Sequence, residues 1–225
     1  MISGASGVFA KRNSEFLNIA VFHGNPWQAL FLCNRPEGTA MKGIIFTELI
    51  EMVEVTFGRD MMDSVFDSVE LPSGGMYTSV GTYSATELLD IVGRLSELTG
   101  TSVHDLVMAY GRYLFGRFKV LYPAMFEGVT CALDFIESVE THIHVEVRKL
   151  YPDAELPSLH AERSQDGSLT VTYRSSRPLA VVAKSLITGC IEHFGGHYDL
   201  ACQDDEDAEG PLTVFLVTRK AEVPA

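Results

Sequence analysis

Two histidines, His142 and His144, lie two positions apart in the segment SVETHIHVEVRKLYPDAELP, residues 138–157. A neutral imidazole nitrogen is the commonest protein ligand of transition metals. If the segment is a helix, each histidine lies about 100° to one side of Ile143. The helical wheel therefore does not choose between them, and a hydrogen-bonded core ring without a ligand fits both. The apolar stripe of this helix consists of Ile136, Val139, Ile143, Val147 and Leu150.

A row of polar side chains is predicted in the stretch TVTYRSSR, residues 170–177. Alternate side chains of an extended strand share a face, so Tyr173, Ser175 and Arg177 lie roughly 6–7 Å apart along one side. Two hydroxyls and a guanidinium in such a row suit a ligand with carboxylates or phosphates. The spacing alone is not specific, because a strand that simply ends in water shows the same residues.

Cysteine and histidine also gather near the C-terminus, at Cys190, His193, His197 and Cys202. Thiolate and imidazole ligands at such short spacings are typical of zinc sites, so a zinc-dependent enzyme is one alternative function. Two observations argue against it. A Gly-Gly pair breaks the predicted helix between the two histidines, and Cys190 also fits the apolar stripe of that helix.

The chain is strongly acidic, with 30 Asp and Glu against 17 Lys and Arg and a formal net charge of −13. That charge argues against partners that present a nucleic-acid backbone or an anionic membrane surface. No apolar run reaches the roughly 18 residues of a membrane span, and no signal peptide is recognisable. The four cysteines form no Cys-x-x-Cys pair, which is typical of the reducing cytoplasm.

Two halves with different periodicity must position these residues. Apolar residues recur with the helical period in segments 41–58, 59–71, 84–100, 102–122 and 130–151. After Pro157 the period changes to two, and Asp166-Gly167 predicts a hairpin between strands at 159–164 and 168–176. A helix from Pro178 to residue 194, a strand at 197–203, an acidic loop at 204–210 and a strand at 211–220 follow. The second half is thus predicted to be ββαββ, and the chain α+β.

The first 40 residues differ from the rest, because they lack clear periodicity and are interrupted by glycines. Met41 opens the first clean helical pattern. We therefore expect a leader over residues 1–40, which is disordered or an artefact of the start site. A single domain over 41–220 and a short tail over 221–225 would follow.

Four motifs, MKGIIFTELIEMVE, GRYLFGRF, IHVEVRKLYPDAELP and YRSSR, occur in the order and at the spacing typical of one family. From Met41 to about Lys220 the sequence resembles the H-NOX family, the haem-nitric oxide/oxygen binding domains. Each motif is weak alone, but the set is specific. The resemblance implies the H-NOX fold, in which a mainly helical N-terminal half and a C-terminal four-stranded antiparallel sheet bury haem b between them.

The resemblance also implies roles for individual residues. The family's proximal haem ligand corresponds to His144, by the register of the residues around it. The family's Tyr-x-Ser-x-Arg motif, which binds the haem propionates, corresponds to Tyr173, Ser175 and Arg177. Pro157 corresponds to the proline that presses on the macrocycle and distorts it, which is one of a protein's means of tuning haem.

The distal positions that are polar in oxygen-binding relatives are aliphatic in this sequence. The distal tyrosine corresponds to Val182, and the other polar positions correspond to Leu49 and Leu114. Without a distal hydrogen-bond donor O₂ binds poorly, whereas NO still binds ferrous iron. We therefore expect an NO sensor that discriminates against O₂. The predicted apolar wall also includes Ile45, Phe118 and Leu186.

The family mechanism implies a switch. Binding of NO weakens the bond between iron and His144, the haem relaxes from its distortion against Pro157, and the helix that carries His144 shifts. No P-loop, kinase or cyclase motif is recognisable, so we expect a non-enzymatic, cytoplasmic bacterial protein that signals to a separate partner. By resemblance, that partner is a sensor histidine kinase or a cyclic-di-GMP enzyme. A module of the same fold that binds another tetrapyrrole remains an alternative.

Overall fold

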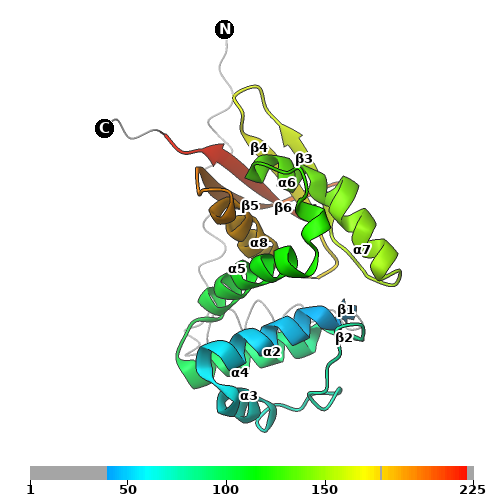
Figure 1. Ribbon diagram of the computed structural model, residues 1–225, viewed down its shortest axis with the longest axis vertical. Helices are drawn as coiled ribbons and strands as arrows, with labels where there is room; N and C mark the ends of the chain where they lie inside the picture. Colours follow the sequence, from blue (N-terminus) through cyan, green and yellow to red (C-terminus); the bar gives the residue numbers. More distant parts are fainter. Residues whose placement is uncertain (1–39, 178, 222–225) are drawn as a thin grey trace.

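The computed structural model describes residues 40–177 and 179–221, which form a helical part and a sheet part (Figure 1). The α+β prediction is confirmed, and the predicted helices and strands occur in the expected order. Residues 1–39 of the predicted leader, Pro178 and the last four residues lie outside the described residues. The domain limits at 41 and 220 stay predictions.

The helical part contains α2 (Gly43–Phe57), α3 (Arg59–Phe66), α4 (Ala85–Thr99) and the first half of α5 (Val103–Leu121). Capping serines fix where two of these helices begin. The Ser84 hydroxyl accepts from the backbone N–H of Thr86, and the Ser102 hydroxyl accepts from that of Asp105. In the described part of the chain, every helix is too short or too polar to cross a membrane.

A two-stranded antiparallel ladder, which the sequence pattern does not predict, closes the helical part. β1 (Ala40–Lys42) pairs with β2 (Thr82–Ser84), and Met41 lies opposite Tyr83. Three residues are too few to show a period of two, so the pattern could not reveal these strands. Gly43 begins α2 against the facing loop, because a Cβ there would lie 1.9 Å from the carbonyl oxygen of Thr78.

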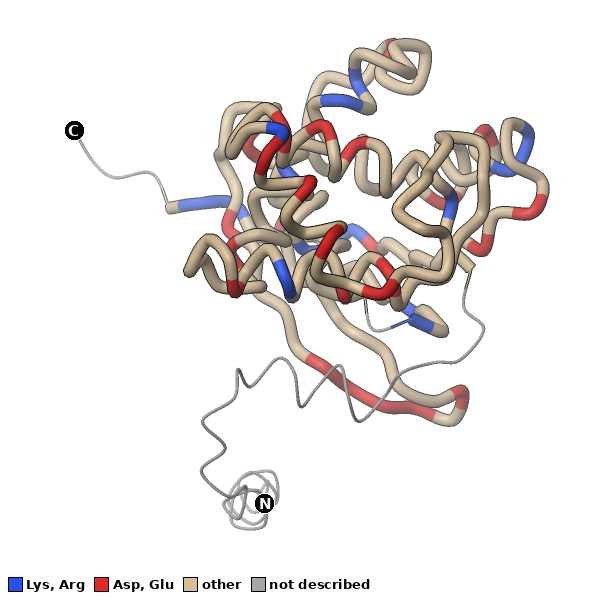
Figure 2. Tube along the Cα trace, turned by 90° about the horizontal axis from the view of Figure 1, so that it is seen from below, with Lys and Arg blue, Asp and Glu red and all other residues tan. Residues whose placement is uncertain are grey.

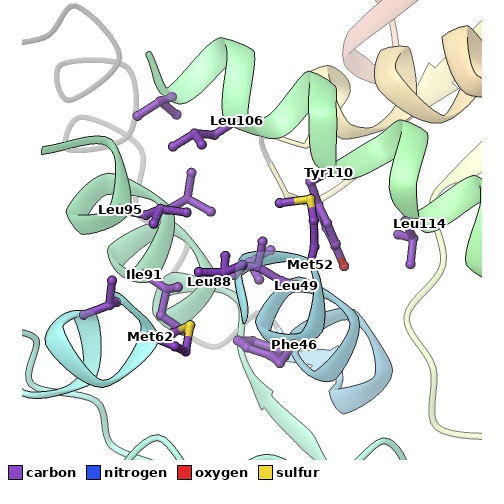
Figure 3. Packing of buried hydrophobic residues seen from close by; sticks show 14 of the residues in the cluster. Phe46, Leu49, Met52, Met62, Leu88, Ile91, Leu95, Leu106, Tyr110 and Leu114 are labelled. Atoms are coloured by element: carbon purple, nitrogen blue, oxygen red, sulfur yellow. The ribbon is translucent and has the colours of Figure 1, made fainter. Parts of the chain in front are cut away.

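An apolar core fills the space between α2, α3, α4 and α5 (Figure 3). Leu49 and Leu114 belong to this core, with 1% and 0% of their surfaces exposed. Phe46 stacks on Tyr77 with a ring-centroid distance of 4.6 Å, which anchors the loop before β2. Each fully buried side chain of this size contributes about 1.5–3 kcal/mol, so burial holds this part together.

Helix α5 joins the two parts of the molecule, because its second half packs closely against α8 (Ala180–His193) (Figure 1). Small residues permit the approach. A Cβ at Gly111 would lie 1.7 Å from the Oγ atom of Ser185, and one at Gly189 would lie 3.1 Å from the Cβ of Phe115. A short 3₁₀ helix, η1 (Pro123–Phe126), follows α5, since a proline cannot continue it.

The predicted helix at 130–151 is present, but it is not a regular α-helix. It consists of α6 (Ala132–Ser138), a π-helical turn η2 (Val139–Ile143) and α7 (His144–Leu150) in direct succession. The backbone N–H of His144 donates to the carbonyl of Val139, five residues earlier, which is the π pattern. Such turns are rare and often lie at functional sites. This one ends where His144 begins α7.

The sheet part is a four-stranded antiparallel sheet with the strand order β3-β4-β6-β5. Its strands are β3 (Ser158–Arg163), β4 (Leu169–Arg174), β5 (Tyr198–Asp207) and β6 (Gly210–Arg219). Leu169, Val171 and Tyr173 alternate on the buried face of β4, which packs in a second apolar core with side chains of α6 and α8. β4 ends at Arg174, so Ser175 and Arg177 follow the strand instead of continuing it.

The predicted acidic loop at 204–210 is mostly strand, so that prediction is wrong. β5 extends through Asp207, and its acidic residues follow one another along an extended hairpin with β6 (Figure 2). Side chains of β6 and β4 hold two of these carboxylates: the Thr213 hydroxyl donates to Asp204 at 2.9 Å, and Arg174 forms an ion pair with Asp207. Charge alone indicated a loop because carboxylates are depleted in strands.

Candidate functional site

A cavity of about 310 Å³ lies between the helical part and the sheet part. Its walls come from α2, α5, η2, α7, β4 and α8, and from the segment between α7 and β3. Most lining side chains are aliphatic or aromatic, and such an enclosure suits a large apolar ligand that carries a few charged groups. The polar or ionisable lining residues are Lys42, Tyr122, His144, Tyr151, Glu155, Tyr173, Ser175, Arg177 and Cys190.

The two histidines of the segment 138–157 lie in different environments. His144 lines the cavity and is only 8% exposed, whereas His142 is exposed. The π turn changes the geometry that the helical wheel assumes, because each residue of this wider turn rotates less than in an α-helix. Leu150, a predicted stripe residue, is 55% exposed and lines the cavity. The structure therefore separates two residues that regular helical spacing leaves equivalent.

Glu140 orients the ring of His144. The Nδ1 atom of His144 lies 2.9 Å from Oε2 of Glu140, four residues earlier. The same carboxylate accepts the backbone N–H of Leu159 on β3 at 3.2 Å and the guanidinium of Arg148 at 3.2 Å. Glu140 was not among the predicted site residues, although the Glu-x-x-x-His spacing on a helix was a usable signal. Histidines that bind metals generally donate their second ring N–H to such an acceptor.

The protonation of this pair favours a ligand role. Burial lowers the pKa of His144 below its ordinary value, and the hydrogen bond and charge of Glu140 offset only part of that effect. Burial pushes the pKa of Glu140 upward, but hydrogen bonds from His144, the Leu159 N–H and Arg148 outweigh it, so the pKa is lowered. At neutral pH a neutral imidazole therefore faces a carboxylate. Because a carboxylate can only accept, Nδ1 carries the proton and Nε2 keeps a free lone pair.

Tyr173, Ser175 and Arg177, the predicted polar row, all line the cavity. The guanidinium of Arg177 donates to the carbonyl of Ala40 at 2.7 Å and to that of Glu155, and its backbone N–H donates to the Ser175 hydroxyl at 3.1 Å. Burial raises the pKa of Tyr173, and the Ser175 hydroxyl and the Arg177 charge offset part of the rise. The phenol therefore stays protonated and can donate a hydrogen bond.

The Nε atom of Arg177 is buried without a hydrogen-bond partner, and among the described residues it is the one side-chain atom in that condition. Buried polar groups are rarely left unpaired, because doing so costs about 1–3 kcal/mol. A carboxylate from a ligand would pair with this N–H and with the neighbouring hydroxyls. The residues therefore fit haem, which combines an apolar macrocycle, two carboxylates and an iron that binds imidazole.

The other predicted site residues divide into two groups. Leu49 and Leu114 do not lie on the wall of the cavity, because they pack in the apolar core of the helical part, as Figure 3 shows. Ile45, Phe118 and Leu186 of the cavity wall pack against this core. The predicted residues that do line the cavity are Pro157, Ile45, Phe118, Val182 and Leu186.

Side chains from three places join the helical part to the segment that follows α7. Asp153 accepts the ammonium of Lys42 at 3.0 Å and the hydroxyl of Thr82 at 3.1 Å, and these two residues lie on β1 and β2. The hydroxyl of Tyr151 lies 3.2 Å from that of Tyr122 at the end of α5. We call these five residues the clasp. It ties the helix that carries His144 to the opposite side of the cavity.

The proposed Cys/His zinc site is not formed. In residues 40–177 and 179–221, no three or more His, Cys, Asp or Glu side chains are placed to hold a metal ion. Cys190 is 2% exposed and lines the cavity, and burial raises the pKa of its thiol, which opposes thiolate ligation. The ring of His193 packs against Phe194, and Cys202 is exposed on β5.

Comparison with known proteins identifies relatives along most of the chain. The sequence profile of the Haem-NO-binding family matches residues 42–201. An Fe(II) unliganded H-NOX protein from K. algicida is 36% identical, with a TM-score of 0.70, covering 82% of this chain and 100% of that one. The IWP-051-bound H-NOX from Shewanella woodyi, in the Fe(II)CO state, is 36% identical with a TM-score of 0.69, covering 82% of this chain and 97% of that one.

A longer curated protein is also similar. Soluble guanylate cyclase 89Db of Drosophila melanogaster is 26% identical over 197 residues, which is 80% of this chain. The chain spans only about 29% of the length of that cyclase, so the likeness concerns one part of it. The family match and the shared fold agree with the cavity, its buried histidine and its unpaired arginine nitrogen. The chain belongs to the H-NOX family of haem-based gas-sensor domains.

Proposed function

We propose that this protein is an NO sensor that binds haem b in the 310 Å³ cavity, with His144 as the axial ligand. The observation that carries the proposal is the buried imidazole of His144, which is 8% exposed, lines the cavity and places Nδ1 2.9 Å from a carboxylate oxygen of Glu140. This leaves the lone pair of Nε2 for iron. When bound, ferrous haem would supply an iron that binds a diatomic gas.

The polar row anchors the carboxylates of the cofactor in this proposal. Arg177 supplies the unpaired Nε–H, and its two terminal nitrogens are fixed by the carbonyls of Ala40 and Glu155. Tyr173 and Ser175 supply hydroxyl donors beside it. Because the guanidinium is already held in place, little side-chain entropy is lost when a propionate binds. Pro157, on the cavity wall, would press on the macrocycle.

Selection of NO over O₂ would follow from the apolar distal side. Ile45, Phe118, Val182 and Leu186 present only carbon atoms to the cavity. A bound O₂ is polarised and needs a hydrogen-bond donor, whereas NO binds without one. Tyr122 also lines the cavity, but its hydroxyl lies 3.2 Å from that of Tyr151 in the clasp. We therefore assign Tyr122 to the link between the two sides and not to the ligand.

The output would be a conformational change read by a separate protein. Loss of the His144 ligand would free α7 to move, and the clasp would transmit that movement to β1, β2 and the end of α5. By family, a sensor histidine kinase or a cyclic-di-GMP enzyme is the proposed partner. The protein itself would then be a cytoplasmic, non-enzymatic bacterial sensor.

Absorption spectra of the purified, haem-loaded protein test the proposal. The ferrous form should show a Soret band that shifts when NO is added, and it should form no stable oxygen complex in air. His144→Ala should abolish this band, and added imidazole should restore it. His142→Ala is the matched control, because that exposed ring two residues away should be dispensable.

Each negative result has a distinct meaning. If haem never binds, the cofactor proposal fails. An absorption band that appears with another tetrapyrrole would then favour a module of the same fold that binds that ligand. If haem binds but His142→Ala has the effect expected of His144→Ala, the ligand assignment is wrong. A stable oxygen complex would contradict the NO selectivity and leave haem binding intact.

A further inference from the structure

Glu140 is the residue of this site that the proposed function does not yet explain. It lies in the π turn, and both of its carboxylate oxygens are engaged. Oε2 contacts Nδ1 of His144 at 2.9 Å and the backbone N–H of Leu159 at 3.2 Å, while Oε1 accepts from Arg148 at 3.2 Å. A surface glutamate on a helix needs none of these contacts. Their convergence beside a buried histidine indicates a specific role.

Helix geometry holds the two side chains together. Glu140 lies inside the turn Val139–Ile143, and the backbone N–H of His144 closes that turn on Val139. The Leu159 N–H then ties the carboxylate to strand β3, where Leu159 pairs with Tyr173. The carboxylate position is therefore set by the sheet as well as by its own helix. This makes the contact with His144 a fixed feature of the site.

A fixed carboxylate on Nδ1 changes what Nε2 does. It withdraws the Nδ1 proton toward itself, which makes Nε2 a stronger electron donor to a metal. Arg148 shares the same carboxylate and draws some of its negative charge away. The strength of the histidine as a ligand would thus depend on how Glu140 divides its charge between His144 and Arg148.

We propose that Glu140 is a positioning residue that strengthens the bond from His144 to iron and thereby sets how readily NO releases the histidine. The inference rests on the proposed function, since it needs iron at His144. It assigns this control to one side chain, and the residues of the polar row and the distal wall have no part in it. Because Glu140 also accepts the Leu159 N–H of β3, release of His144 would change a contact with the sheet.

The first test needs no haem. In the apo protein, ¹⁵N NMR of the His144 ring should show a proton on Nδ1 and none on Nε2. Glu140→Ala should produce a mixture of the two tautomers, because the acceptor is gone. Glu140→Gln keeps an acceptor for both His144 and the Leu159 N–H, so it should keep the fold and the tautomer while removing the charge. An unchanged tautomer in Glu140→Ala would overturn the positioning role.

The second test uses the haem-loaded protein. Resonance Raman of the unliganded ferrous form should show a lower iron–histidine stretching frequency in Glu140→Gln than in wild type. Affinity for ferrous haem should fall by roughly 10-fold, the lower end of the range for partners of metal-binding histidines. Conversion to the histidine-free NO complex, followed by its Soret band, should be faster.

Glu146→Gln is the matched control. Glu146 lies on the same helix, two residues from His144, but its ion pair is with Lys149 at 2.6 Å. Removing that charge should leave unchanged both the iron–histidine stretching frequency and the rate of conversion to the histidine-free NO complex. If Glu140→Gln and Glu146→Gln shift them equally, the effect is one of general helix charge and the inference is wrong. If the wild type and both variants fail to bind haem, the proposed function is wrong.

Discussion

The two sides of the cavity are built in opposite ways. On the side of α7 and β4, hydrogen bonds hold two polar side chains in place: Glu140 fixes the His144 ring, and two carbonyls fix the Arg177 guanidinium. On the side of α2, α5 and α8, Ile45, Phe118 and Val182 present no polar atom. The packing of the helices shapes that wall. These side chains offer a ligand no hydrogen bond.

The difference shows what each side contributes. The polar side needs particular atoms in particular directions, so replacing one residue should remove a defined interaction. The apolar side needs only shape and the absence of a donor, so most substitutions there should change stability before they change ligand choice. If this contrast is correct, variants on the two sides should differ in what they affect as well as in how much.

The largest effect after loss of the axial ligand is expected at Arg177. Arg177→Leu should weaken haem binding by roughly 10- to 100-fold, because a charge-assisted hydrogen bond contributes about 1.5–3 kcal/mol. Titration of the apo protein with haem measures this. Arg174→Leu is the control, since Arg174 pairs with Asp207 on the hairpin and does not line the cavity. Equal losses in the two variants would contradict a specific anchor at Arg177.

Sequence patterns predicted the polar side better than the apolar one, for a physical reason. Tyr173, Ser175 and Arg177 were found because an extended strand would put them on one face, and all three line the cavity although β4 ends at Arg174. His144 could not be separated from His142 by spacing, since the two residues flank Ile143 symmetrically on a helical wheel. The family resemblance singled out His144, which is the buried one. Whether it binds iron stays a prediction.

The distal wall shows the limit of positional reasoning. By resemblance, Leu49, Leu114 and Val182 occupy the positions that are polar in oxygen-binding relatives, yet only Val182 lines the cavity. Which face of a core helix borders a cavity depends on how closely the neighbouring helices pack. The pattern of apolar residues in a single sequence does not reveal that packing. The fold class was predictable because periods of 3.6 and 2 are local. The ladder of β1 and β2 depends on a pairing partner distant in sequence, since Ala40 lies opposite Ser84. The extension of β5 pairs with residues close in sequence, such as Asp207 with Gly210, and was missed because its carboxylates indicate a loop.

Helix packing on the apolar side is tested by Gly111→Ala. The added methyl group would meet the Oγ atom of Ser185, so α5 and α8 must separate. Overpacking of this kind costs about 1–3 kcal/mol, which thermal unfolding should show as a lower Tm. Gly116→Ala, on the same helix but with open space around it, should instead stabilise the protein by roughly 0.5–1 kcal/mol. A stable Gly111→Ala would mean that the helices are not close-packed.

Val182→Tyr would place a hydroxyl donor among the hydrocarbon side chains of Ile45, Phe118 and Leu186 on the cavity wall. A new hydrogen bond contributes about 1 kcal/mol, so O₂ affinity of the ferrous protein should rise by roughly 5- to 10-fold. Val182→Phe adds the same ring without the hydroxyl and should show no gain. Leu114→Tyr should lower stability without that gain, since Leu114 is fully buried behind the wall. If Val182→Phe raises O₂ affinity as much, shape and not polarity controls selection.

The smallest effect is expected at the clasp, where the two sides meet. Tyr151→Phe and Tyr122→Phe each remove one member of the 3.2 Å hydroxyl pair. A double-mutant cycle in thermal unfolding should give a coupling of only about 0.5–1 kcal/mol. The effect on the response to NO should be clearer than the effect on stability. Hydrogen exchange of β1 and β2 should respond to NO in wild type and respond less in Tyr151→Phe, because one link from α7 is gone.

Tyr198→Phe provides the comparison for that experiment, since Tyr198 lies on β5, away from the clasp. It should leave the response of β1 and β2 to NO unchanged. Lys42→Met would then cut the second link, the ion pair with Asp153 at 3.0 Å, and should reduce the response further when combined with Tyr151→Phe. A full response in the combined variant would show that movement of α7 reaches the helical part by another route. The packing of α5 against α8 would be the remaining path, because it joins the apolar wall directly to the sheet.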